Sequence, residues 1–298
     1  MADVLSKGNL FDTVLVNDLF DKVRGKSSVA TLGKRTPIAF SGNKIFTFEM
    51  DSEVDIVAEN GKKTKGGMTL APVVMAPIKF EYSARVSDEF LYASEENKIE
   101  IIKSFNEGFA KKLARGLDIA AILGLNPRSK EAANTVGDNC LAKKVDQKVT
   151  YESATADVKI EEALGLVEGS EYNPSGIVIA PSVRTDISKM RLTGGSRAYP
   201  DFAFGATPSN LGSQKLEVNN TVSFNTPTNK LVGVVGDFET AFQWGYAKDV
   251  MLEVIKYGDP DSQGKDLKAY NQVCLRAEAY IGWGVLDGKA FAKLETAE

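Results

Sequence analysis

The sequence predicts an α+β protein, and three observations lead to that class. Residues 94–124 have the apolar spacing of one long helix, several shorter stretches alternate apolar and polar residues as strands do, and helices and strands are mixed without a regular βαβ repeat. The 298-residue chain is 43% hydrophobic and 26% charged, the composition of an ordinary folded protein with material for one large or two modest domains.

Residues 1–36 are predicted to form an arm. A short amphipathic helix can form through Val14, Leu15, Leu19 and Val23, whereas SSVATLGKRT after it has no helical stripe and is expected to be extended. A lone short helix followed by extended chain has too little surface of its own to bury. The arm must therefore dock on something else to be ordered.

Residues 40–86 are predicted to form a long β-hairpin. Apolar and polar residues alternate from Phe46 to Met50 and again from Ile78 to Val86. An isolated two-stranded ribbon is marginal in water, so this one should rest on its own domain or on another subunit. A solvated loop of mixed charge is the alternative. The middle of the segment is charged, with acids on the outward side and lysines near the glycine-rich tip: Asp51, Glu53, Asp55, Glu59, Lys62, Lys63 and Lys65.

Residues 94–124 are predicted to form the long helix around which the chain is organised. Ser94 is a suitable N-cap, and Gly124 followed by Pro127 marks the end. At about 1.5 Å per residue such a helix is on the order of 40 Å long, which suits a rod across which other elements lie. Its apolar stripe, at steps of three and four, consists of Ile99, Ile102, Phe105, Phe109, Leu113, Leu117 and Ala120.

The rest of the chain is predicted to hold a second, α+β unit and a closing strand. Residues 157–169 favour a helix, IVIAPS a buried strand, SVRTDISKMRLTGG a helix capped by Ser182, and KLVGVVGDF and DVMLEVIKY two further strands. From residue 271 to the end, apolar residues alternate with polar ones, which predicts one long strand with one buried face.

Several classes of function are excluded by residue content. The chain has no histidine, which removes triad hydrolases and HExxH metalloproteases. GDPDSQGKD from Gly258 has the wrong spacing for a phosphate loop and is interpreted as a turn. Cys140 and Cys274 lack zinc or disulfide spacing and are expected to be buried or half-buried thiols. We therefore expect no catalytic residues, no cofactor and no metal.

Two further partners are not expected. The net charge of −4 gives no general attraction to nucleic acid, which proteins bind mainly through lysine and arginine. No run approaches the roughly 18 to 20 apolar residues that cross a bilayer, and the amino terminus lacks a signal-peptide pattern, so no membrane contact is predicted and the protein should be made in the cytosol.

The order of arm, hairpin, long helix, α+β domain and returning strand resembles the major capsid protein of tailed bacteriophages, the Hong-Kong-97-like fold. KFEYSARVSDEFL at 79–91 followed by a helix ending LARGLDIAAILG, the segment 173–200, and GDFETAFQWGYAKDVMLEV at 236–254 are each similar to segments of that family. The resemblance implies an N-arm at 1–36, an E-loop at 37–82, a peripheral domain at 83–154 with a spine helix and a sheet, an axial domain at 155–260, and the closing peripheral strand at 261–298.

The resemblance also implies a function without catalysis. The subunit would assemble into hexamers and pentamers of an icosahedral shell that encloses double-stranded DNA without binding it tightly. Its partners would be further copies of itself, a portal, and a separate scaffold protein, because the chain starts directly at the arm. It would be located in the virion capsid, and in the host cytoplasm during assembly. Covalent crosslinking is not predicted.

The expected assembly contacts lie in the arm and in the hairpin. They are Leu10, Phe11, Leu15 and Leu19, together with Asp51, Glu53, Asp55, Glu59, Lys62, Lys63 and Lys65. The alternative within the same fold is an encapsulin, a shell around a cargo enzyme, in which residues 11–24 would be a cargo-binding helix. The alternative from another class is a carboxylate-dependent enzyme, for which the sequence offers no motif.

Overall fold

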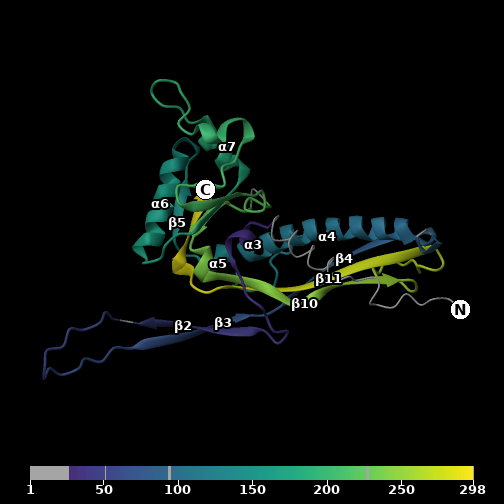
Figure 1. The fold of residues 1–298 in the computed structure, drawn as a ribbon, viewed down its shortest axis with the longest axis horizontal. Coiled ribbons are helices and arrows are strands. Elements are labelled where there is room, and N and C mark those ends of the chain that lie inside the picture. Colours follow the sequence, from purple (N-terminus) through teal and green to yellow (C-terminus); the bar gives the residue numbers. More distant parts are fainter. Residues whose placement is uncertain (1–26, 51, 93–94, 226–227, 298) are drawn as a thin grey trace.

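The computed structural model describes residues 27–50, 52–92, 95–225 and 228–297. Figure 1 shows a long helix lying along a sheet, a second sheet flanked by helices above one end of it, and a two-stranded ribbon that extends from the base in the opposite direction to the long helix. The described strands form a four-stranded sheet, a six-stranded sheet and a two-stranded ribbon. The predicted α+β class is confirmed.

The long predicted helix is α4 (Glu95–Leu123). The described part of its predicted stripe is buried or half-buried and belongs to the larger hydrophobic core. Gly124 ends the helix at a φ of +70°, which glycine adopts without strain, and its amide donates to the carbonyl of Ala120 at 3.0 Å. The prediction of the helix and of its carboxyl end is confirmed.

The four-stranded sheet holds the longest strands. β10 (Phe242–Ile255) and β11 (Gln272–Val285) pair antiparallel, and β4 (Ile78–Ser87) pairs with the other side of β11. The short β1 (Lys34–Arg35) runs parallel to β10 at the opposite edge. The predicted buried face of the closing strand is confirmed by Val273, Leu275, Ala277, Ala279, Ile281 and Trp283, each no more than 1% exposed.

The six-stranded sheet has its own hydrophobic core. Helix α6 (Ala156–Gly169) contributes Ile160 and Val167 to it, and helix α7 (Pro181–Lys189) contributes Val183 and Ile187. The predicted helices of this unit and its strands at IVIAPS and KLVGVVGDF are confirmed apart from their exact bounds. The strand predicted at DVMLEVIKY does not belong to this unit, because it is part of β10 in the four-stranded sheet.

The strands of the six-stranded sheet, in the order β5-β12-β9-β6-β8-β7, are β5 (Lys148–Tyr151), β12 (Phe291–Thr296), β9 (Leu231–Gly236), β6 (Gly176–Ile179), β8 (Gln214–Val218) and β7 (Asn210–Leu211). The 3₁₀ turns nearby are Ser153–Thr155, Pro200–Gly205 and Gly288–Ala290. The short helices α5 (Leu141–Lys144) and α8 (Phe238–Ala241) place their buried residues in the larger core instead.

The predicted pairing of the hairpin was wrong. β2 (Asn43–Met50) pairs with β3 (Met68–Met75), whereas β4, which was expected to be its partner, pairs with β11. The alternation pattern places residues 68–75 in the middle of the hairpin, whereas they form β3, which contains Pro72. In a two-stranded ribbon both strands are edges, where a proline without an N–H group is tolerated.

Three local predictions also need correction. The second part of the predicted arm, residues 27–36, is not wholly extended, because it contains the short helix α3 (Ser28–Leu32). Ser182 does not cap α7, whose N-cap is Ala180 without a side-chain hydrogen bond. The last stretch is not one strand: β11 ends at Val285, and β12 after it joins the six-stranded sheet beside β5 and β9. Residues 261–298 therefore contribute to both sheets.

Candidate assembly surfaces

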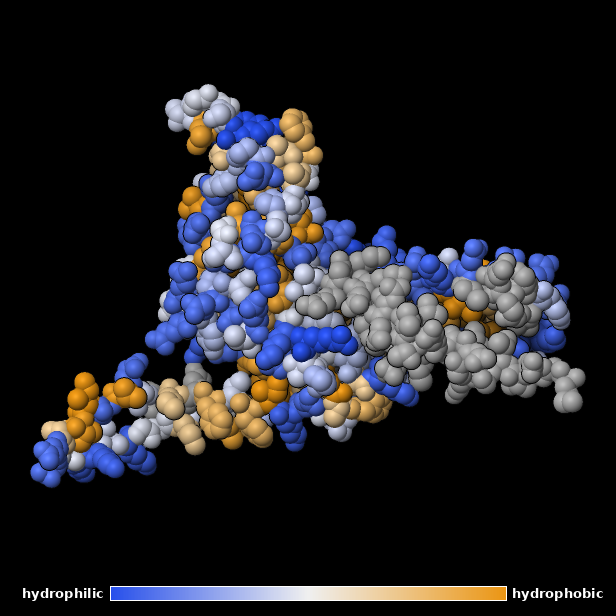
Figure 2. All heavy atoms as spheres, in the orientation of Figure 1, coloured by the Kyte–Doolittle hydropathy of each residue, from blue (hydrophilic) through white to orange (hydrophobic). Residues whose placement is uncertain are grey.

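The β2–β3 ribbon has one face that the described chain leaves uncovered. The strand register places Phe46 opposite Pro72, Phe48 opposite Leu70 and Met50 opposite Met68, and directly opposed residues share a face. Phe46, Phe48 and Leu70 are 53%, 65% and 48% exposed. Figure 2 shows the ribbon as a band of hydrophobic colour projecting from the body. We call the set Phe46, Phe48, Met50, Met68, Leu70 and Pro72 the apolar ribbon face.

The opposite face of the ribbon is anchored at its base. Val73 and Met75 are buried, and Met75 lies against β11. A Cβ added to Gly284 would lie 2.7 Å from Met75 Cγ, and one added to Gly282 would lie 3.1 Å from the carbonyl oxygen of Ala76. Glycine at these two positions of β11 lets the base of the ribbon approach closely. The ribbon is thus fixed to its own subunit at one end and free of it at the other.

The loop between the two strands, residues 52–67, is exposed throughout its described length. It contains the predicted Glu53, Asp55 and Glu59 and the three lysines at 62, 63 and 65. The Thr64 hydroxyl donates to Asp55 Oδ2 at 2.9 Å. Val54 and Ile56 are 89% and 97% exposed, so apolar and acidic side chains alternate here without a cover from the described chain.

Five of the predicted contact residues lie outside the described residues. They are Leu10, Phe11, Leu15, Leu19 and Asp51, and the predicted helix cap Ser94 is also outside. The structure does describe the last part of the predicted arm, residues 27–36, in which Val29, Ala30 and Leu32 are buried and join the arm to the body.

That junction is built around Asp118, which lies inside α4 and is 0% exposed. Its carboxylate accepts hydrogen bonds from the Ser27 hydroxyl at 2.6 Å, the backbone amides of Ser28 and Val29 at 3.1 and 3.2 Å, and the Asn219 side-chain amide at 2.6 Å. These donors come from the start of α3 and from the segment after β8. One carboxylate therefore ties the base of the arm and the second unit to the long helix.

Burial raises the pKa of Asp118 from 3.8 to about 6, and the hydrogen bonds from Ser27, Ser28 and Val29 oppose that rise. Glu217, whose own pKa is raised by burial, adds a further small rise through like charge. No cation forms an ion pair with Asp118 among the residues that the structure describes.

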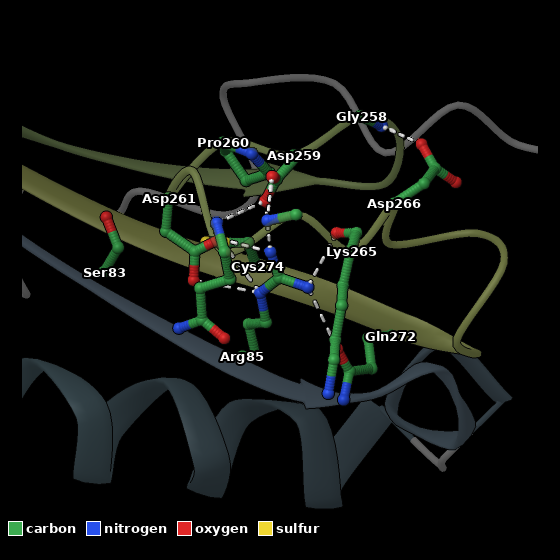
Figure 3. Close-up of polar contacts among 12 residues, drawn as sticks. Ser83, Arg85, Gly258, Asp259, Pro260, Asp261, Lys265, Asp266, Gln272 and Cys274 are labelled. Atoms are coloured by element: carbon green, nitrogen blue, oxygen red, sulfur yellow. Dashed lines mark hydrogen bonds and ion pairs between the residues drawn. The ribbon is translucent and has the colours of Figure 1, made fainter.

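A second polar cluster holds the connection between β10 and β11 (Figure 3). Arg85 of β4 forms ion pairs with Asp259, at 2.6 Å, and Asp261, and its Nη1 donates to the Lys265 carbonyl at 3.0 Å. The side chain of Arg85 is only 10% exposed. The hydrogen bond from Arg85 lowers the pKa of Asp261. Asp259 Oδ2 in turn accepts a hydrogen bond from the backbone amide of Gly264, with 2.6 Å between the two atoms, so the loop folds around the guanidinium of Arg85.

Metal and membrane features are absent from the part of the chain that the structure describes. No cluster of three His, Cys, Asp or Glu residues suits a metal ion there, and none of the described helices has the length and apolar character to cross a membrane. Cys140 and Cys274 are buried thiols, as predicted.

Sequence reasoning missed the three features that organise these surfaces. The apolar ribbon face could have been found from the alternation of Phe46, Phe48 and Met50 once their partner strand was known. Asp118 had a visible signal, a single carboxylate within the otherwise apolar LDIAAIL. Arg85 had none, because its acidic partners lie more than 170 positions away.

Comparison with known proteins covers nearly the whole chain. The model of the phage capsid family matches residues 7–296. A solved structure from Mycobacterium phage Ogopogo is 29% identical, with a TM-score of 0.78 over 91% of this chain and 92% of that one, and one from Gordonia phage Cozz is 26% identical, with a TM-score of 0.74 over 92% and 87%. The capsid of a native GTA particle, at 16% identity and a TM-score of 0.63 over 91% and 90%, shares the fold. The search of curated proteins finds no match.

Proposed function

The chain belongs to the phage capsid family and is a major capsid shell protein, and from this premise we propose that the apolar ribbon face is the principal contact through which one subunit holds the next. The observation that carries the proposal is the pair of opposite ribbon faces. One is anchored on its own β11 through Met75, whereas the other exposes large apolar side chains that gain free energy only when another surface covers them.

The proposal extends to the predicted arm and tip. Leu10, Phe11, Leu15 and Leu19 would bury against a neighbouring subunit or the underside of α4. In the loop, Asp51, Glu53, Asp55 and Glu59 would oppose cations of a neighbour, and the three lysines at the tip would oppose carboxylates. Such exposed pairs are worth about 0 to 1 kcal/mol each, and they set register more than they add affinity.

Subunits joined in this way would form hexamers and pentamers of an icosahedral shell. In this proposal double-stranded DNA is enclosed and not tightly bound, which the net charge of −4 supports because phosphate repels an acidic wall. A portal and a separate scaffold would be the other partners, and assembly would take place in the host cytoplasm. The expected division is an N-arm at 1–36, an E-loop at 37–82, a peripheral domain at 83–154 and 261–298, and an axial domain at 155–260. We keep this division with three changes: the E-loop would be the ribbon at 43–75, β10 would belong to the peripheral domain, and β12 would belong to the axial one.

The first test replaces two aromatic residues of the apolar ribbon face. Phe46→Ser with Phe48→Ser should abolish shell assembly, because burying the exposed part of each ring is worth about 2 kcal/mol at every contact. The thermal stability of the unassembled subunit should hardly change, since the two rings contribute little to its own core. Thr47→Ser, on the other face of the same strand, is the matched control. Normal shells from the double variant, seen by electron microscopy, would contradict the proposal.

The second test reverses charge at the tip. Lys62→Glu, Lys63→Glu and Lys65→Glu together should impair assembly and leave the stability of the subunit nearly unchanged. The defect should depend on salt, because surface charges are screened over a Debye length of about 8 Å at physiological ionic strength. Unfolding of the unassembled variant would mean that the tip belongs to the subunit's own core, and wild-type assembly at low salt would mean that the tip makes no contact.

A further inference from the structure

Positive charge gathers at the carboxyl end of α4 and in the loop that follows it. Figure 1 shows this end of α4 at the corner where the unit with the six-stranded sheet begins. Residues 111–130 contain one acid, Asp118, which is 0% exposed and so does not offset charge on the surface. The basic residues of the same stretch, which we call the basic patch, are Lys111, Lys112, Arg115, Arg128 and Lys130.

Four members of the basic patch are neighbours across α4 and the loop. Lys112, Arg115 and Arg128 line one groove of about 520 Å³, which lies between α4, β4 and the loop. Lys111 precedes Arg115 by four positions, and residues at this spacing share a face of a helix. The charge therefore continues from the groove onto the outer face of α4.

The segment after β8 links the fifth member to the others. Arg115 donates a hydrogen bond to Asn220 Oδ1 at 2.5 Å, and its guanidinium carbon lies 5.4 Å from the centre of the Phe224 ring. The next residue, Asn225, donates its side-chain amide to the carbonyl oxygen of Lys130 at 3.5 Å. Lys130 thus lies on the side of the patch that Arg115 occupies, and the five cations form one continuous surface.

The charge of the basic patch is largely uncompensated. Apart from Arg115, its side chains make no ion pair with any residue that the structure describes. Glu81, the acid that lines the groove, forms an ion pair with Arg276 at 3.5 Å. Glu131, next in sequence to the patch, is exposed and removes part of the charge. A surface of this kind attracts a polyanion.

Resting on the function proposed above, we propose that the basic patch faces the interior of the shell and contacts the phosphate backbone of the enclosed duplex DNA. Lys111 and Lys130 lie outside the lining of the groove, so the cations extend beyond the space that a single protein segment would fill. Duplex DNA is broad enough to cover them, and it carries one negative charge per about 1.7 Å of its axis. Lysine and arginine side chains contact phosphates without regard to sequence.

The contact would be weak at each subunit. The chain as a whole has a net charge of −4, so attraction to DNA is confined to the basic patch. A few phosphate contacts per subunit hold DNA loosely, and salt weakens them steeply because each contact releases a counterion. The position of the patch also identifies which side of the subunit forms the inner wall.

Binding of duplex DNA to unassembled subunits tests the patch first. Fluorescence anisotropy of a labelled duplex, titrated with subunits at several salt concentrations, is the measurement. If three cations meet phosphates at once, the affinity should fall about 40-fold between about 50 and 200 mM salt, and Lys112→Gln with Arg128→Gln should reduce this fall to about 3- to 4-fold.

The matched control removes two exposed lysines far from the patch, Lys256→Gln with Lys268→Gln, and should keep the salt dependence of wild type. Absence of binding at low salt would overturn the proposal. The same would follow from a salt dependence that the patch variant leaves unchanged, or that the control reduces as much. Thermal unfolding of the unassembled subunits checks that each variant is folded.

Amine labelling tests the contact inside the particle. A small amine-reactive reagent modifies accessible lysines, and mass spectrometry compares each lysine in DNA-filled particles with the same lysine in particles emptied of DNA. Lys111, Lys112 and Lys130 should lose most of their modification when DNA is present, whereas the three lysines at the tip of the ribbon should not. Equal modification of the patch in filled and emptied particles would overturn the proposal.

Charge reversal distinguishes DNA from a protein partner. Lys112→Glu with Arg128→Glu should form shells as wild type does but retain less DNA. If this variant no longer forms shells at all, the patch holds a protein segment and the DNA assignment fails. If it forms shells with the normal DNA content while Phe46→Ser with Phe48→Ser forms none, the DNA assignment also fails, and the proposed role of the ribbon stands.

Discussion

The buried carboxylate of Asp118 makes a prediction about stability that can be worked out from the structure. We consider Asp118→Asn, which keeps the size of the side chain and removes its titration. The free energy of unfolding of wild type minus that of the variant should fall as pH rises, because only the wild-type group has to lose its proton in a buried position.

The size of the effect follows from the pKa of Asp118. A rise from 3.8 to about 6 on folding means that the ionised form is destabilised by about 3 kcal/mol relative to the unfolded chain. The stability that protonated Asp118 contributes is complete below pH 3.8, and it is lost as pH rises through 6. About half of the change, roughly 1.4 kcal/mol, should fall between pH 5 and pH 8.

Urea unfolding at several pH values, below the concentration at which subunits assemble, measures this difference. Trp244 and Trp283 are both 1% exposed, so their fluorescence reports loss of the core. The matched control is Asp138→Asn, whose carboxylate is 92% exposed. A difference for Asp118→Asn that is flat with pH, or that increases with pH, would refute the reasoning, because the hydrogen bonds from Ser27 and its neighbours would then outweigh burial.

Two further predictions concern the long helix and the arm. Phe109 is 3% exposed and belongs to the core that includes Leu275 and Trp283, so Phe109→Ala should lower the free energy of unfolding by about 3 to 5 kcal/mol in urea titration, and a loss below about 1 kcal/mol would mean that the stripe packs elsewhere. Deleting residues 1–25 should leave a folded subunit, because the anchor at Ser27 is kept, but one that assembles poorly; normal shells in electron micrographs would rule out a role for the arm in assembly.

The elements that the sequence predicted well are those whose pattern is local. The stripe of α4, its end at Gly124 and the alternation in β4 and β11 are each complete within one stretch of chain, so periodicity was enough to find them. Strand pairing was not predictable in this way. β4 faces β11 across nearly two hundred positions, and alternation specifies which face of a strand is buried, not which strand lies beside it.

The candidate surfaces were predicted in part for the same reason. The charge of a segment follows directly from its residue types. The acidic residues and lysines of 52–67 are exposed, as expected for a contact surface. The apolar ribbon face required knowing that Phe46 lies opposite Pro72, and the arm junction required knowing that Asp118 meets Ser27. Both depend on contacts between distant or unrecognised elements, which a single sequence does not display.

The loop held by Arg85 has one more consequence. Asp259 and Asp261 in this loop face a positive charge, as the carboxylates of a cation-binding loop do. Here the charge is the guanidinium of Arg85, a side chain of β4, and the turn around Gly264 closes the loop around it. Because Arg85 belongs to the same chain as the loop, its guanidinium is present at a fixed effective concentration and is not lost on dilution, as a bound ion would be. We expect the shape of this end of the sheet to be indifferent to chelators and to the calcium or magnesium content of the surroundings, so that a particle moving between media of different composition keeps it unchanged.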